Sequence, residues 1–206
     1  MLGQSSGFSQ PAGAPVHLRP HVAAFEHREV GQFLTYKEAL TAAMMRLAEH
    51  PRTLFVGQGM RFSGQMMFPT LQGVPMEKRI ELPVAEDFQM GFCTGLALKG
   101  FIPISVYPRW DFLLLAANQL VNHLDKLPLM GDFRPKVIIR TGVGPKIPLD
   151  AGPQHTQNHT AAFRLMLKTV AVVELMAAEE VLPCYQQALA GEGSVLLIEH
   201  LEKYLA

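Results

Sequence analysis

Apolar residues recur along the chain in two alternating patterns from Leu34 onward. One pattern repeats every three or four positions, as on the buried face of an amphipathic helix. The other is a short continuous run, which is typical of a strand buried on both faces. The helical pattern occupies residues 36–50, 87–99, 110–124, 160–168 and 178–190, and the strand-like runs are TLFVG, RIELP, IPISVY, KVIIRTG, VAVVEL and SVLLIEH.

This alternation predicts an α/β fold. Apolar strands that are separated by helices form parallel sheets, which the helices cover on both sides. We therefore expect a three-layer α/β/α arrangement around a mainly parallel central sheet. Residues 57–75 interrupt the pattern with Gly, Ser, Pro and Gln, and either a long loop or a broken helix fits them.

Residues 1–31 have a different composition, because they are rich in Gly, Ser and Pro and show no apolar period. We predict a flexible N-terminal tail over this range and a single domain over residues 32–206. A disordered leader and an arm that lies on a partner are both compatible with this composition.

The overall composition narrows the classes of protein to which the chain can belong. Apolar residues make up 49% of its 206 residues, enough to bury a full core. A formal net charge of zero and a pI of about 7.1 remove the electrostatic case for nucleic acid or an anionic membrane as partner. The apolar runs also fall far short of the roughly 20 residues that a membrane span needs.

The cysteines and the first residues bear on the compartment. Cys93 and Cys184 cannot build a disulfide framework, and the first 16 residues lack the apolar stretch of a secretion signal. These features predict a cytoplasmic protein.

Candidate chemistry lies where strands lead into helices, since ligands of parallel sheets bind beyond the carboxyl ends of the strands. Glu86 follows RIELP at the start of a helical pattern. It is either a carboxylate that the helix dipole favours or one that exchanges a proton with a ligand. The aromatic residues of YPRWDF either fill the core or offer one ring for stacking on a flat ligand.

The loop GPQHTQNHT places His155 and His159 four residues apart. No acidic residue accompanies them, so the number of ligands disfavours a zinc site, and we predict no metal site in this chain. A histidine presented from an active-site loop, as an acid, a base or a hydrogen-bond donor, is the favoured interpretation.

Four stretches carry a family resemblance when they are taken together: RIELPVAEDFQMGFCTGLALKGFIPI, YPRWDFLLLAANQLVNHLDK, AGPQHTQNHTAAF and SVLLIEHLEKY. In this order and spacing they resemble the pyrimidine-binding domain of transketolase-type thiamine-diphosphate enzymes. The similarity is greatest to the beta subunit of the 2-oxo acid dehydrogenase decarboxylase component, as in pyruvate dehydrogenase. It extends over about residues 34–204 and implies a thiamine-diphosphate-binding fold.

The resemblance also implies roles for individual residues. Glu86 would hydrogen-bond the N1′ atom of the cofactor's aminopyrimidine and favour its imino tautomer, Phe112 would stack on the pyrimidine ring, and His155 would face the substrate and assist proton transfer. Gln58 and Val84 are expected to contact the cofactor as well.

The implied function is that of one subunit of a split enzyme. The chain would supply the aminopyrimidine half of a thiamine-diphosphate site for decarboxylation of a small 2-oxo acid and acyl transfer. An alpha-like subunit would hold the diphosphate and its magnesium ion, in a heterotetramer or a larger hetero-oligomer. The chain by itself is expected to be inactive.

The chain departs from the family at two places, and two alternatives follow. The family's first strand usually ends in Gly-Glu-Glu, and Gln58 and Gly59 stand in the places of the two glutamates. The sequence also ends at Ala206, where the family continues into a C-terminal domain. One alternative is a transketolase-like subunit for two-carbon transfer. The other is a non-catalytic assembly or binding module that has kept the fold.

Overall fold

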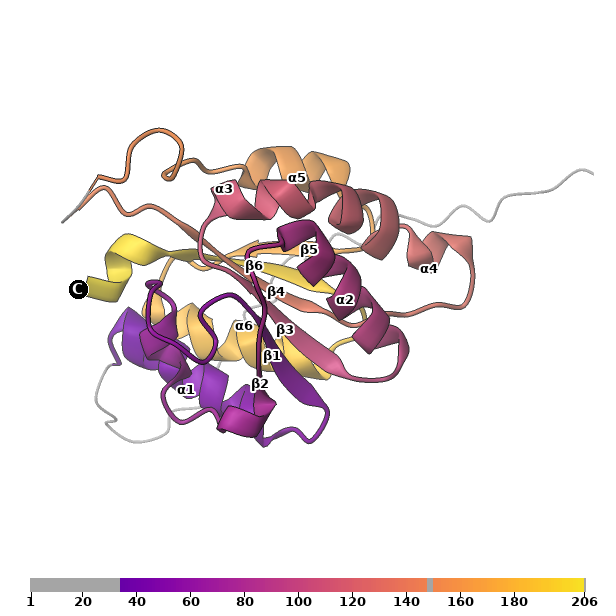
Figure 1. Cartoon of the computed structure of the whole chain (residues 1–206), viewed down its shortest axis with the longest axis horizontal. Helices are drawn as coiled ribbons and strands as arrows, with labels where there is room; N and C mark the ends of the chain where they lie inside the picture. Colours follow the sequence, from indigo (N-terminus) through magenta and orange to yellow (C-terminus); the bar gives the residue numbers. More distant parts are fainter. Residues whose placement is uncertain (1–33, 148–149, 206) are drawn as a thin grey trace, which may run out of the picture.

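Six parallel strands form the central sheet of the protein, whose computed structural model describes residues 34–147 and 150–205 (Figure 1). The strands are β1 (Thr53–Gly57), β2 (Arg79–Glu81), β3 (Ile102–Tyr107), β4 (Ile138–Val143), β5 (Ala171–Glu174) and β6 (Val195–His200). They lie in the order β2-β1-β3-β4-β6-β5, and every pairing between neighbours is parallel. The parallel sheet predicted from the apolar runs is confirmed. The predicted tail over residues 1–31 lies outside the described residues.

Helices cover both faces of this sheet. Figure 1 shows α1 (Tyr36–Glu49) and α6 (Ala178–Ala190) on one side, and α2 (Glu86–Leu98), α3 (Trp110–Leu113) and α5 (Thr160–Met166) on the other. Successive strand residues point to opposite faces. Phe55 and Ile138 therefore pack in the cluster under α1 and α6, whereas Val56 and Ile139 pack in the cluster under α2, α3 and α5. The predicted three-layer α/β/α fold is confirmed.

The shorter elements occur in the connections. They are η1 (Phe68–Leu71), η2 (Met76–Lys78), η3 (Leu114–Ala116), η4 (Gln119–Leu124), α4 (Leu127–Met130) and η5 (Leu201–Leu205). The Gly- and Pro-rich stretch over residues 57–75 is thus a long loop that contains the single 3₁₀ turn η1.

The continuous helix predicted over residues 110–124 is instead three consecutive pieces. Trp110, Leu113 and Ala116 are buried at a spacing of three, which suits the tighter 3₁₀ turn of η3. Leu120 and Leu124 continue the same buried face at a spacing of four, through the wider π-helical turn of η4. The changes of helical pitch keep these apolar side chains against the sheet.

An ion pair lies fully buried between two central strands. Arg140 on β4 donates to the carboxylate of Glu199 on β6 through Nε at 2.6 Å and through Nη2 at 2.9 Å. The hydroxyls of Tyr185 and Tyr204 donate to the same carboxylate. This bidentate and hydrogen-bonded geometry offsets the desolvation of both charges, and each partner depends on the other.

Replacing Arg140 tests this dependence. Arg140→Met leaves the Glu199 carboxylate buried without its counter-charge and is expected to lower the free energy of unfolding by about 3–5 kcal/mol. The double variant Arg140→Met with Glu199→Gln removes the buried charge and keeps an acceptor for the two tyrosine hydroxyls, so it should recover part of that loss. Urea denaturation measures both, with Arg46→Met in an exposed ion pair with Glu49 as a control expected to change by about 0–1 kcal/mol. A change below 1 kcal/mol in Arg140→Met would contradict the prediction.

Asp125 joins the end of η4 to the segment before β5. Its buried Oδ1 accepts hydrogen bonds from the backbone amides of Lys168 at 2.9 Å, Thr169 at 2.8 Å and Val170 at 3.0 Å. Burial raises the pKa of Asp125, but the hydrogen bonds from Lys126 and from these amides outweigh it, and the net pKa is lowered. The ionised carboxylate therefore stabilises the folded chain.

This lowered pKa predicts a pH dependence of stability. The contribution of Asp125 is complete above the unfolded pKa of about 3.9 and is lost as the pH falls through the lower folded-state pKa. Asp125→Asn is expected to cost about 1–3 kcal/mol at pH 7 and much less at pH 3. Urea unfolding at both pH values checks this, with the exposed Asp132→Asn as control. A cost that does not change with pH would refute it.

Candidate functional site

Four neighbouring strands end beside one another at one edge of the sheet, and the residues singled out in the sequence follow them. Gln58 comes directly after β1, and Val84 and Glu86 follow β2. Phe112 follows β3, and His155 lies in the connection after β4. Because all the strands are parallel, the fold brings the connections that carry these residues to the same edge.

Glu86 is the first residue of α2 and is half-buried. The N-terminal end of a helix favours a negative charge, by about 0.3–1 kcal/mol at exposed positions. One turn later, Gln89 is buried and its Nε2 donates to the Val106 carbonyl at 3.0 Å and to the Ser105 hydroxyl at 3.1 Å. Gln89 thereby ties the first turn of α2 to β3. Gln89 is not among the residues predicted from the sequence, where its one signal is a polar residue on the apolar face of a helix.

Tyr107, at the end of β3, makes a second connection to this turn. Its hydroxyl donates to the backbone carbonyl of Glu86 at 3.3 Å. Burial raises the pKa of Tyr107 well above its usual value, so the hydroxyl keeps its proton and remains a donor. The backbone of Glu86 is therefore held at the end of the central strand β3.

Phe112 and His155 are in direct contact. Their ring centroids lie 5.6 Å apart and their planes meet at 83°, an edge-to-face arrangement favourable for aromatic pairs. Both side chains are half-buried. The structure thus brings together two of the residues that the sequence assigned to one site.

His159 does not join His155 in a shared cluster of ligands. Its ring packs edge-on against Trp110, with centroids 6.0 Å apart. Across residues 34–147 and 150–205, no group of three or more His, Cys, Asp or Glu side chains is arranged to hold a metal ion.

The loop after β1 is organised by a carboxylate from the neighbouring strand. Glu81, the last residue of β2, accepts hydrogen bonds from the backbone amides of Gly59 at 2.6 Å, Met60 at 2.7 Å and Arg61 at 2.7 Å. Gln58 itself is exposed, and Val84 is 66% exposed. Sequence reasoning missed Glu81, although an acidic residue at the end of an apolar strand was a signal for it.

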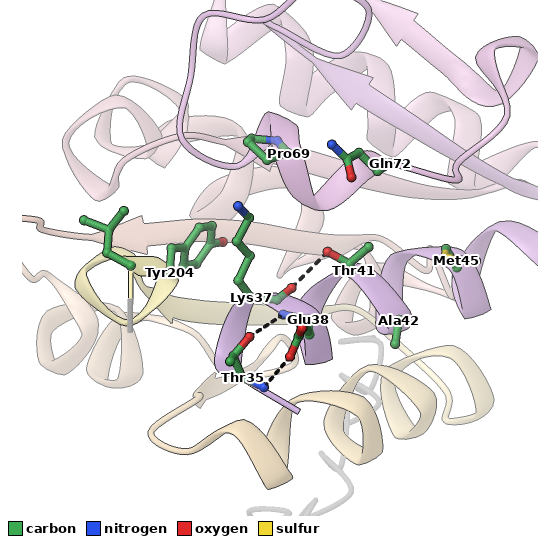
Figure 2. A pocket seen from close by; sticks show the side chains of 10 residues that line it. Thr35, Lys37, Glu38, Thr41, Ala42, Met45, Pro69, Gln72 and Tyr204 are labelled. Carbon is green, nitrogen blue, oxygen red and sulfur yellow. Dashed lines mark hydrogen bonds between the residues drawn. The ribbon is translucent and has the colours of Figure 1, made fainter. Parts of the chain in front are cut away.

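A cavity of about 480 Å³ opens in another part of the molecule, between α1, η1 and η5 (Figure 2). It shares no residue with the strand-end group, and its lining includes Lys37, Pro69 and Tyr204. Figure 2 shows that Thr35 and Glu38, which also line it, are bonded to each other at the start of α1. We assign the candidate site to the strand ends, because the carboxylate of Glu86 and the imidazole of His155 lie in the segments that follow the strands there.

In the portion of the chain that the structure describes, no helix is long and apolar enough to cross a membrane.

The chain is similar in sequence to beta subunits of the pyruvate dehydrogenase E1 component. A pyruvate dehydrogenase E1 component subunit beta from Gracilaria tenuistipitata var. liui is 32% identical over 131 residues, which is 61% of this chain and 38% of the relative. The chloroplastic subunit beta-3 from Oryza sativa subsp. japonica is 31% identical over 61% of this chain and 32% of the relative. The subunit beta from Chaetosphaeridium globosum is 27% identical over 85% of this chain and 54% of the relative.

Among solved structures, the inactive beta4 tetramer of a split gene transketolase matches with a TM-score of 0.62 and 19% identity. The match covers 81% of this chain and 51% of that chain. The chain is E1 beta-like in sequence and transketolase-like in fold. It spans between about a third and about half of the length of these curated relatives. No protein-family model matches it.

Removing the Glu81 carboxylate tests the organisation of the loop after β1. Glu81→Ala leaves three amides without their acceptor and is expected to destabilise the chain by about 1–3 kcal/mol. Hydrogen exchange should become faster at the amides of Gly59, Met60 and Arg61. Glu77→Ala, at an exposed position of η2, is the control and should leave these rates unchanged. Equal exchange rates in the two variants would show that Glu81 does not hold the loop.

Proposed function

We propose that this chain is the beta-like subunit of a split thiamine-diphosphate enzyme. It supplies the aminopyrimidine half of the cofactor site, and the complex decarboxylates a 2-oxo acid and transfers the acyl fragment. The observation that carries the proposal is the convergence of Glu86, Phe112 and His155 on one edge of the sheet, with the last two in contact.

The chemistry of these side chains fits one half of such a cofactor. An aminopyrimidine is a flat ring with nitrogen atoms that exchange protons. Glu86 offers a hydrogen-bond acceptor for a protonated ring nitrogen, and Phe112 offers an aromatic face for stacking. Gln58 and Val84 complete the proposed contacts from the loops after β1 and β2. The two exposed positions leave this half-site open on the side where a second chain would close it.

Each residue then has a distinct task. When bound, thiamine diphosphate supplies the electron sink for cleaving the bond next to the substrate carbonyl. Glu86 would hold a proton at the ring nitrogen and take it back onto its carboxylate, from a helix start that favours its negative charge. His155 faces the substrate side and exchanges a proton there, with its ring oriented by Phe112.

The proposal includes a partner. An alpha-like subunit would hold the diphosphate and its magnesium ion in a heterotetramer or a larger assembly. Apolar side chains beside the half-site support an interface, since Val84 is 66%, Phe88 57% and Leu115 63% exposed. We also propose a cytoplasmic location, in keeping with the free cysteines Cys93 and Cys184.

Two alternatives rest on particular observations. The fold likeness to a split gene transketolase favours two-carbon transfer as the other enzymatic function. Gln58 lacks a carboxylate, and the amides of the following loop are bonded to Glu81, which favours a non-catalytic assembly module. A complex that retains thiamine diphosphate would favour either enzymatic function over the assembly module. Turnover of a 2-oxo acid would then favour decarboxylation with acyl transfer over two-carbon transfer.

Glu86→Gln tests the proposed role in the complex that copurifies with a tagged chain from its own host. Glutamine keeps the size of the side chain but cannot hold or release the proton. We expect an unchanged complex mass in native mass spectrometry and turnover of a 2-oxo acid lowered by about 10²–10⁴-fold. Asp87→Asn, at the next and exposed position of α2, is the matched control and should retain turnover.

The same preparation shows whether the proposal fails. Near-normal turnover in Glu86→Gln would remove Glu86 from the chemistry. A complex that assembles but retains no thiamine diphosphate would instead support the assembly module.

A further inference from the structure

Arg109 lies between β3 and α3 and has no part in the function proposed above. Its Nη1 atom donates to two backbone carbonyls, those of Gly144 and His155, each at 2.7 Å. The side chain is half-buried. A single guanidinium nitrogen thus joins the end of β4 to the residue that faces Phe112.

The backbone near His155 is otherwise held by a local turn. The His155 amide donates to the Gly152 carbonyl at 3.0 Å, and the Thr156 hydroxyl donates to the same carbonyl at 3.1 Å. These bonds shape the turn but do not attach it to β3. Arg109 makes that attachment through a charged donor, whose hydrogen bonds are stronger than neutral ones.

Two neighbours of Arg109 hold the chain after His155. Asp111 accepts a hydrogen bond from the side chain of Gln157 at 2.7 Å, and the Trp110 indole donates to the Thr160 hydroxyl at 3.2 Å. Arg109 alone of these three contacts the backbone of His155 itself. Its position two residues after Tyr107 also couples the turn to the strand that carries the Glu86 contact.

We infer that Arg109 is a positioning residue that holds His155 edge-on to Phe112 by fixing the His155 backbone. The inference deepens the proposed function, because His155 acts there on the substrate side. The positioning itself requires neither cofactor nor partner, so it is measured on the full chain alone. If Glu86→Gln does not affect turnover, the proposed function fails but the positioning role of Arg109 stands. If Arg109→Met leaves His155 unchanged, the positioning role fails but the proposed function stands.

The test follows the ring signals of His155 by NMR in the full chain labelled with ¹⁵N-histidine. His155→Gln assigns these signals among the eight histidines. Phe112→Leu gives the shift of His155 without the neighbouring ring. In Arg109→Met, we expect the His155 signals to move toward the Phe112→Leu values and the His155 amide to exchange about tenfold faster.

Two further variants separate positioning from general destabilisation. Arg109→Lys keeps the charge and a donor, but its ammonium ends one bond short of Nη1, so we expect the His155 signals to return only part of the way toward wild type. Arg134→Met is the matched control, because Arg134 also donates through Nη1 to backbone carbonyls, those of Pro128, Gly131 and Phe133, but away from the site. It should leave His155 unchanged.

Wild-type signals and exchange in Arg109→Met would overturn the inference. So would equal changes in all the histidines. If Arg109→Met does not fold, Arg109→Gln takes its place with the same expected shift and the same criteria.

Discussion

Every strand of the sheet runs in the same direction, so each connection must return across one face of the sheet before the next strand begins. The crossovers cover both faces with helices and bury the strands between two apolar clusters. They also bring the loops that follow the strands to a single edge. Residues as distant in sequence as Gln58 and His155 lie in loops at this edge because four adjacent strands, β2, β1, β3 and β4, end beside one another.

The last residue of β3 and the segment that follows it connect the loops at this edge of the sheet. Tyr107 holds the backbone of Glu86, and Arg109 holds the backbone of His155. Phe112 lies against the His155 ring. A central strand is suited to this task because it is paired on both sides and cannot move without disturbing β1 and β4. The arrangement gives the Glu86 carboxylate and the His155 imidazole a common support on β3.

A carboxylate from the neighbouring strand fixes the shape of the loop after β1. Both oxygens of the Glu81 carboxylate are bonded to backbone amides, so this acidic group organises the loop. Gln58 then stands exposed at the start of an ordered loop. Its neutral side chain lies on a backbone whose next three amides are hydrogen-bonded to Glu81.

The sequence alone determined the class of fold, the approximate range of nearly every helix and strand, and the position of Glu86 at a helix start. Apolar periodicity is a local property of the sequence, and it indicates whether an element is buried on one face or on both. Residues 110–124 were one exception, because an average helical period hides a change of pitch, and the four-residue helix α4 was another.

Only the tertiary structure decided which distant groups meet. Arg109 reaches carbonyls 35 and 46 residues further along the chain, and Glu81 binds amides that precede it by 20 to 22 residues. Such partners depend on which strands become neighbours. That order follows from packing the whole sheet, and no local pattern in the sequence records it.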